Sequence, residues 1–353
     1  MERRSRSKTA SSFGDCPFRP LKVPTSLEAL LKDRVAIAVG PELLAVEQAI
    51  ARELASPVGL IHEMGDFIAG AGGKRLRPIL LLMAARLAGY TGPRAVRMGC
   101  VVELLHTATL IHDDVVDQAP LRRGRPSANA RWGDDASVLV GDHLYSKSFA
   151  LMVQDGDAAV LETLARATVS MTEAEVFQLE RKRSGTIGEA DYLRIITQKT
   201  ASFMSACCRI GALLAGAEDK QVEGLTRFGL AIGIAFQMSD DSLDFVADQA
   251  RLGKAVGADL KEGKRTLPLI ATMDRAAPAE RDRVQSLLRS RALAPAEIEE
   301  IRRLVVKYEG VEYALGRAHR YAQSAKEALR PFKDCEDKET MALVADFVVD
   351  RDR

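Results

Sequence analysis

Apolar residues recur at helical spacing along nearly the whole chain, and this periodicity is the feature that most constrains the fold. It starts in LEALLKDRVAIAVGPELLAVEQAIARELA and returns in later segments. These are 79–89, 96–112, 136–153, 158–180, 189–216, 222–246, 267–273, 280–290, 296–306 and 312–330. An apolar stripe with a period of 3.6 residues predicts amphipathic helices, and alternating strand patterns are almost absent. Glycine and proline cluster between the segments, where they favour turns.

The pattern predicts an all-α fold, with one large helical domain over residues 26–353. A length of 353 residues and an apolar content of 47% allow a large core. The sequence TSLE has the form of a capping box, so we expect the first helix to be capped by Thr25. Residues 1–25 carry six Lys or Arg and many Ser and Pro. We expect a disordered basic tail there; a transit peptide is the alternative.

Composition limits the classes of partner. The 50 Lys and Arg residues balance 49 Asp and Glu residues, so no bulk charge predicts a nucleic-acid partner. The five cysteines follow no metal or disulfide spacing and predict reduced thiols in the cytoplasm. No apolar run reaches the roughly 18 residues needed to span a bilayer, so we expect at most peripheral membrane contact, through the basic tail.

Two groups of three aspartates share one spacing and lie in otherwise apolar helical segments. They are Asp113, Asp114 and Asp117 in LIHDDVVD, and Asp240, Asp241 and Asp244 in FQMSDDSLDF. Residues i and i+4 lie on one face of a helix, one turn apart. One such group alone is typical of a solvated acidic turn. Two in one bundle predict a site for hard divalent cations, and Mg²⁺ prefers a few carboxylates together with phosphate oxygens and water.

Basic, glycine-containing loops accompany the aspartate groups. They hold Lys74, Arg75 and Arg77; Arg122, Arg123 and Arg125; and Lys254, Lys261, Lys264 and Arg265. Lys199 and Thr200 lie within an apolar helical segment, in ITQKTAS. Arginine binds phosphate oxygens as a fork and lysine as a point charge. Together, the acidic and basic groups predict a diphosphate held by Mg²⁺, whose apolar part enters a cavity lined by the preceding helix.

The motifs GGKRLRP, LIHDDVVD with LRRG, KTA, FQMSDDSLD and GADLKEGKRTLP occur in this order between about residues 70 and 270. They resemble the ordered signature of trans-isoprenyl diphosphate synthases. The resemblance implies a helical bundle around a deep central cavity, usually a homodimer, with three Mg²⁺ per site, for which Mn²⁺ can substitute. It implies head-to-tail (1'-4) condensation of isopentenyl diphosphate with an allylic diphosphate, farnesyl or geranyl. A proton is then lost to the departing diphosphate.

The resemblance also implies a role for individual residues. Asp113 and Asp117 are expected to be the principal ligands of two Mg²⁺ and Asp240 of the third, with Asp114, Asp241 and Asp244 close by. The isopentenyl diphosphate site is matched by Lys74, Arg77, His106 and Arg123. The allylic diphosphate site is matched by Arg122, Lys199, Thr200, Gln237, Lys254 and Lys264. His106 alone would be interpreted as a core histidine.

Product length is predicted from the residues one helical turn before Asp113, which are Ala108 and Thr109. Short-chain members of the family typically place a bulky aromatic residue there as a floor. Small residues predict a tunnel that continues past Leu105. The stretch HTATLIHDDVVD resembles the long-chain branch, such as octaprenyl diphosphate synthases. We therefore predict a product of about C40 for quinone side chains, within a range of C30 to C50.

Three other functions remain as alternatives. A farnesyl or geranylgeranyl diphosphate synthase would need a floor from another helix. A terpene cyclase shares the first aspartate motif, but Lys74, Arg77 and the second aspartate group argue against it. A non-catalytic subunit of a synthase tends to lose aspartates, and all six are present here.

Overall fold

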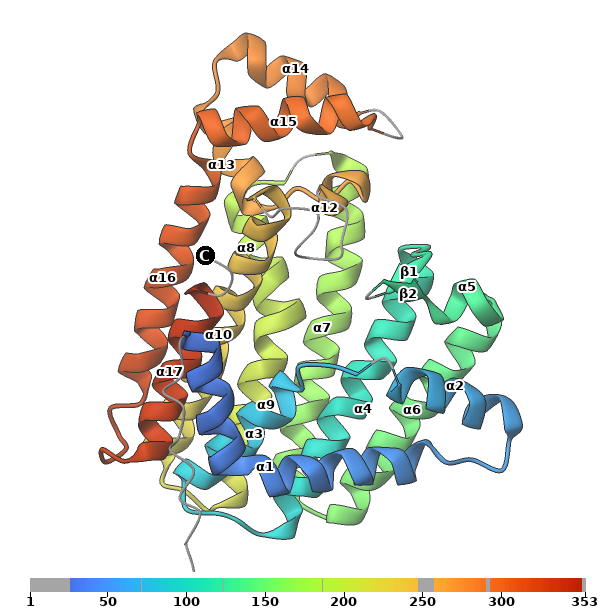
Figure 1. Cartoon of the computed structure of the whole chain (residues 1–353), viewed down its shortest axis with the longest axis vertical. Coiled ribbons are helices and arrows are strands. Elements are labelled where there is room, and N and C mark those ends of the chain that lie inside the picture. The colour runs from blue at the N-terminus through green and yellow to red at the C-terminus, as the bar shows by residue number, and fades with distance from the viewer. Residues whose placement is uncertain are drawn as a thin grey trace, which may run out of the picture.

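The structure is a computed structural model that describes residues 26–70, 72–122, 124–185, 187–246, 257–289 and 293–350. Its first helices are α1 (Leu27–Leu54), α2 (Gly59–Ala69), α3 (Leu76–Leu87), α4 (Pro93–Val116), α5 (Ala128–Trp132), α6 (Asp134–Asp155) and α7 (Ala158–Ser184). Then follow α8 (Glu189–Ile196), the π-helical turn η1 (Thr197–Ala201), α9 (Ser202–Leu214) and α10 (Asp219–Val246). The last are α12 (Ala258–Lys261), α13 (Leu267–Arg275), α14 (Pro278–Leu288), α15 (Pro295–Lys307), α16 (Gly310–Ala328) and α17 (Glu336–Asp350). This arrangement confirms the predicted all-α bundle (Figure 1).

The strand content of the described residues is one short hairpin, in which β1 (Leu121–Arg122) pairs antiparallel with β2 (Arg125–Pro126). The hairpin begins just after α4 ends. It turns the basic segment back over the end of that helix, so Arg122 comes to lie beside Asp114. The sequence did not predict this hairpin, because two-residue strands leave no alternating pattern.

Helix α1 begins at a capping residue. The side chain of Ser26 accepts a hydrogen bond from the backbone N–H of Ala29 at 3.2 Å, so Ser26 caps α1. The predicted cap at Thr25 is therefore wrong by one residue, and Thr25 lies outside the described residues. Serine is the more favourable N-cap of the two residues, and the helix that it caps buries Leu31 and Val35.

The central helix of the bundle is α10, which packs against α9, η1 and α16. Glycines allow its backbone to lie directly against its neighbours. A Cβ atom at Gly229 would stand 2.6 Å from the carbonyl oxygen of Met204, and one at Gly233 would overlap Ala201 in η1. The main hydrophobic core surrounds these contacts, and a smaller one joins α12, α13, α14 and α15 at one end of the molecule (Figure 1).

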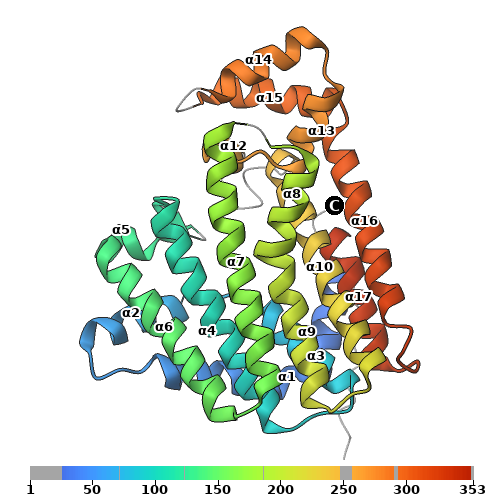
Figure 2. The same ribbon diagram turned by 180° about the vertical axis from the view of Figure 1, so that it is seen from behind.

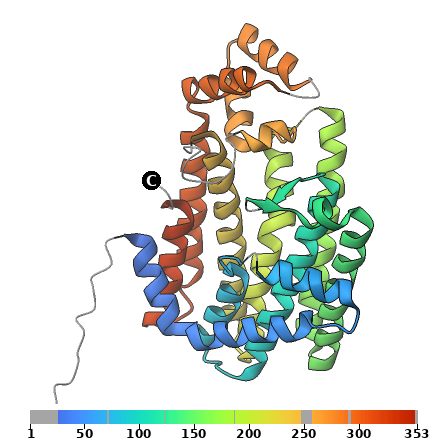
Figure 3. The same ribbon diagram turned by 45° about the vertical axis from the view of Figure 1, so that its right-hand side comes forward.

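Helix α17 was missing from the sequence prediction, although it buries Met341, Val344 and Val348 in the main core. It packs against α16, α1 and α10. Figure 3 shows the first part of α1 beside α17, so segments from opposite ends of the described chain lie together. In the part of the chain that the structure describes, no helix is both long and apolar enough to cross a membrane.

Candidate active site

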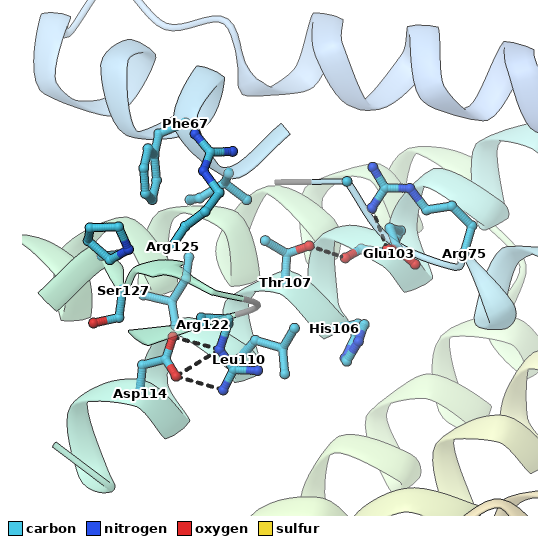
Figure 4. Close-up of a pocket in the computed structure, with 15 residues that line it drawn as sticks. Phe67, Arg75, Glu103, His106, Thr107, Leu110, Asp114, Arg122, Arg125 and Ser127 are labelled. Atoms are coloured by element: carbon cyan, nitrogen blue, oxygen red, sulfur yellow. Dashed lines mark hydrogen bonds and ion pairs between the residues drawn. The ribbon is translucent and has the colours of Figure 1, made fainter. Parts of the chain in front are cut away.

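The first aspartate group lies at the C-terminal end of α4. Asp113 and Asp114 belong to its last turn, and Asp117 is its C-cap, whose backbone N–H bonds the carbonyl of Asp113 at 2.8 Å. The predicted one-turn separation of Asp113 and Asp117 is thus present. Asp114 points elsewhere and is buried against Arg122, which bonds both carboxylate oxygens at 2.7 Å (Figure 4).

The second aspartate group lies near the end of α10, and its members differ in environment. Asp240 is exposed, whereas Asp241 is buried. Asp241 accepts hydrogen bonds from the Tyr192 hydroxyl at 2.7 Å and the Gln237 amide at 2.8 Å. The carboxylate of Asp244 accepts the backbone N–H groups of Ala258 and Asp259, both at 3.1 Å. Asp244 therefore caps the start of α12, a structural task that sequence spacing does not indicate.

One pocket has Lys182, Lys199 and Lys264 in its wall, and we call it the lysine pocket. Asp241 also lines it. Lys199 Nζ lies 3.8 Å from Asp113 Oδ2, and Lys264 Nζ lies 3.4 Å from Asp117 Oδ2. Each of these lysines thus links the pocket to a carboxylate of α4. This pairing brings residues from both aspartate groups to one site.

The π-helical turn η1 carries Lys199 and Thr200, and such turns often mark functional sites. Thr200 donates a hydrogen bond to the Gln237 side-chain oxygen at 3.0 Å. Lys199 is also paired with Glu175 of α7. The predicted residues Lys199, Thr200, Gln237, Asp241 and Lys264 therefore gather around one pocket. Lys254 lies outside the described residues.

A second pocket, the arginine pocket, is lined by Arg75, Arg122 and Arg125 together with His106 and Asp114 (Figure 4). His106 Nε2 lies 2.9 Å from Arg77 Nη1, so these two predicted residues are in contact. Arg77 also lies over the Phe203 ring, with its guanidinium carbon 5.6 Å from the ring centre. Lys74 is exposed in the loop before α3, and Arg123 lies outside the described residues.

Arg75 has a different role from its two neighbours in the GGKRLRP loop. It bonds Glu103 Oε1 at 2.7 Å and Glu47 Oε2 at 3.0 Å, and it adopts a left-handed conformation with φ of 48°. The ion pairs hold the loop against α1 and α4. Arg125 holds the other end of the same loop, because it donates to the Gly70 carbonyl at 2.9 Å.

Burial raises the pKa of carboxyl groups from both aspartate groups and their surroundings. The pKa of Asp113 rises to about 6, although Lys199 opposes this shift. Burial also raises the pKa of Asp241. Burial, together with the charges of Asp241 and Asp244, raises the pKa of Asp259. Buried carboxylates of this kind gain from a nearby cation.

The carboxylates fit a divalent metal that is completed by a ligand. Within the described ranges, no group of three or more His, Cys, Asp or Glu side chains forms a metal site unaided. Mg²⁺ commonly takes one or two carboxylates and fills its shell with water and phosphate oxygens. Desolvated Asp113 and exposed Asp240 can supply such oxygens to an ion that also binds a polyanion in the lysine pocket.

The predicted chain-length residues lie on α4, one to two turns before Asp113. Ala108 and Leu105 are buried, and Thr109 is half-buried with its hydroxyl bonded to the His106 carbonyl at 2.8 Å. Their effect on product length stays a prediction.

Sequence reasoning missed Tyr192, Glu175 and Asp259. Each contacts or neighbours a predicted residue from a different element, so no local motif links it to the site. Asp259 offered the clearest signal, because it is an acidic residue inside a basic loop.

An all-α bundle in which lysines of one pocket lie beside aspartates from two helices is the arrangement expected of the helical prenyl diphosphate synthases. The sequence pattern of one family, polyprenyl synthetase, matches residues 58–305. The chain belongs to this family, which confirms the predicted resemblance and the predicted type of enzyme. Octaprenyl diphosphate synthase of Escherichia coli (strain K12) is 38% identical over 312 residues, covering 88% of this chain and 96% of that protein.

Two solved structures are similar along nearly their whole length. A polyprenyl synthase from Caulobacter crescentus CB15, complexed with calcium and isoprenyl diphosphate, has a TM-score of 0.87 and 38% identity. The match covers 90% of this chain and 97% of that one. A decaprenyl diphosphate synthase from Rhodobacter capsulatus has a TM-score of 0.85 and 39% identity, with 91% and 99% covered.

Proposed function

We propose that the chain catalyses Mg²⁺-dependent, head-to-tail condensation of isopentenyl diphosphate onto an allylic diphosphate. The product is a long-chain all-trans polyprenyl diphosphate of about C40, for quinone side chains. One observation supports the reaction: Asp241 of the second aspartate group lines the same pocket as Lys199 and Lys264, and these two lysines lie beside Asp113 and Asp117 of the first group. The similarity to an octaprenyl and a decaprenyl diphosphate synthase supports the long product.

The allylic diphosphate would occupy the lysine pocket. Asp113, Asp117 and Asp240 would hold the metal, which when bound neutralises the charge that develops on the departing diphosphate. Lys199 and Lys264 would bind further phosphate oxygens. The apolar side chains of Ile195 and Ile196 line the same pocket and keep water away from the reacting carbon.

Isopentenyl diphosphate would bind on the other side, at Lys74, Arg77 and His106. The bond between C1 and oxygen of the allylic substrate breaks, and the electron pair leaves with the diphosphate. The double bond of isopentenyl diphosphate then forms the new carbon–carbon bond to C1. The departing diphosphate accepts the proton that is lost from C2. The protein contributes mainly by orienting the two substrates.

The first experiment is a product assay with purified protein, Mg²⁺, labelled isopentenyl diphosphate and farnesyl diphosphate, in which the dephosphorylated products are sized by chromatography. We expect a ladder ending near eight isoprene units, and loss of incorporation in EDTA. A product that stops at C20 would agree with the proposed condensation reaction and refute the predicted long-chain product. No incorporation with or without EDTA would favour a cyclase or a non-catalytic subunit.

We also propose that two copies of the chain associate through α6 and α7. Both helices face the viewer in Figure 2. They carry apolar side chains at the surface: Leu139 is 68% exposed, Val153 65% and Val169 58%. Association would remove this apolar area from water.

The chain is expected to work in the cytoplasm. The four described cysteines are free thiols, which agrees with a reducing compartment.

A further inference from the structure

The cations that line the lysine pocket differ in how their charge is balanced. Lys199 is paired with Glu175 and lies 3.8 Å from Asp113. Lys264 is paired with Glu262 at 2.5 Å and lies 3.4 Å from Asp117. Arg265 follows Lys264 directly and also lines the pocket, but it has no carboxylate partner among the residues that the structure describes.

The environment of Arg265 makes this missing partner costly. The side chain is half-buried, and burial lowers the pKa of its guanidinium. Arg289, at the end of α14, adds repulsion and lowers the same pKa further. A partly desolvated cation that faces a second cation has a higher free energy than one in water. The positive charge of Arg265 at this pocket would therefore be compensated by a bound anion.

Lys182 approaches the same place from another element. It lies in the last turn of α7, and its Cε would be 3.4 Å from a Cβ atom built at Gly263. Gly263 has no side chain, so the loop before Arg265 leaves room for Lys182 at this contact, and its φ of 74° is one that favours glycine. Lys182 is exposed and, within the described ranges, has no ion-pair partner either. Two uncompensated cations, from α7 and from the loop before α13, thus line one pocket.

We propose that Arg265, assisted by Lys182, forms an additional anion subsite of the lysine pocket that binds phosphate oxygens of the diphosphate group. The inference rests on the proposed function, because it deepens the recognition of the same ligand. The planar guanidinium of Arg265 can give two parallel hydrogen bonds to a phosphate, and the ammonium of Lys182 gives a point charge. Lys199 and Lys264, by contrast, must share their charge between the ligand and neighbouring carboxylates.

The test measures binding of inorganic diphosphate, with Mg²⁺ present, to the full-length chain by isothermal titration calorimetry. We expect Arg265→Gln to weaken binding about tenfold, which is typical of losing a charge-assisted hydrogen bond. We expect Arg265→Lys to weaken it less, and Lys182→Gln to have a smaller effect because this side chain is exposed. Arg289→Gln is the matched control, since it removes a nearby cation that does not line the pocket and should weaken binding much less than Arg265→Gln does.

Thermal unfolding of the ligand-free variants separates binding from a structural role. Arg265→Gln should melt at the same temperature as the unchanged chain or higher, because it removes an uncompensated charge. Unchanged diphosphate affinity in Arg265→Gln, whatever its melting temperature, would overturn the subsite while leaving the proposed function intact. If the unchanged chain bound no diphosphate at all, both the subsite and the proposed function would fail.

Discussion

At the scale of single residues, the position of Lys199 depends on a side chain that no sequence motif indicates. Glu175 of α7 forms an ion pair with Lys199, and Asp113 lies 3.8 Å from the same ammonium group. Glu175 therefore competes with Asp113 for Lys199 and keeps the carboxylate of Asp113 available for a metal.

Replacing Glu175 by Gln should turn Lys199 toward Asp113. We expect the Mg²⁺ concentration for half-maximal activity to rise several-fold, because a lysine paired with Asp113 must be displaced by the metal. Metal titrations of activity, and of Mn²⁺ binding without substrate, measure this. Glu173→Gln, an exposed change on the same helix, should not alter the requirement. Equal metal dependence in both variants would contradict the role of Glu175.

Tyr192 of α8 positions Asp241 through a hydrogen bond. Tyr192→Phe removes the hydroxyl that donates to the buried carboxylate at 2.7 Å. We expect a loss of about 1–3 kcal/mol in the free energy of unfolding, because a buried acceptor loses a partner. Urea denaturation measures the loss. Tyr145→Phe, at a tyrosine that stacks on Phe149, should change stability much less. Equal stability of the two variants would refute the claim.

From the sequence we could predict which residues belong to the site. We could not predict the hydrogen-bond and ion-pair partners of these residues. Asp113 and Asp117 were placed on one face because helical spacing is a local rule. The pairing of Asp241 with Tyr192, or of Asp244 with the start of α12, depends on how distant segments meet. For the same reason, Arg75 was grouped with Lys74 and Arg77, although it is bound to Glu103 and Glu47.

At the scale of elements, the contact between α10 and η1 positions Thr200 and Gln237 opposite one another. It depends on Gly233, since a Cβ atom there would overlap Ala201. The sequence predicted one continuous helix through ITQKTAS, and the π-helical turn was not foreseen. The π-helical turn includes Ala201, which lies at this contact between distant segments, and helical periodicity in the sequence does not distinguish it from an α-helix.

We expect Gly233→Ala to destabilise the protein by about 1–3 kcal/mol, because two backbones must move apart. It should also reduce activity, since Thr200 lies in the displaced turn. Chemical denaturation and steady-state assays measure both effects. Gly316→Ala in α16 is the matched control: a Cβ atom added there would meet no atom within 4 Å, and alanine should stabilise the helix by about 0.5–1 kcal/mol. Destabilisation of both variants to the same extent would argue against a specific contact.

At the scale of the whole molecule, the all-α class and most helices could be predicted, because their apolar periods are long. The prediction missed helices α2, α5, α12 and α17 and the hairpin. Helix α17 holds Thr340, Met341, Val344 and Val348 in buried positions, yet its first turn is acidic and the segment before it is polar. Its place in the core becomes visible only when α1, α10 and α16 are assembled around it.

Product length depends on the cavity that the assembled bundle encloses. Ala108→Phe tests the predicted tunnel that continues past Leu105. The ring would enlarge a fully buried position one turn before Asp113, so we expect shorter products at similar initial rates. Chromatographic sizing of the products measures the change. Val116→Phe, at an exposed position of the same helix, should leave the length unaltered. Unchanged product length in Ala108→Phe would refute the tunnel interpretation.

Association of two copies through α6 and α7 gives a further prediction. Leu139→Arg places a charge in the proposed interface, where burial without a partner is costly. We therefore expect the dimer to dissociate at a higher protein concentration than the dimer of the unchanged chain does. Sedimentation velocity measures the shift in mass. Val306→Arg, at a 63% exposed position of α15, is the control and should not dissociate the dimer. A monomer in the unchanged chain would contradict the interface.

The packing of α1 against α17 has a consequence for the rate of folding. Arg34 and Glu339 approach within 3.9 Å although some three hundred residues separate them along the chain. Helices can form within microseconds, but joining such distant segments must first overcome the entropy of closing a very long loop. The hairpins of neighbouring helices should therefore assemble early, and the seam between α1 and α17 should close last. Until then, the apolar sides of both helices are open to solvent, and this is the stage at which the chain most needs protection from aggregation.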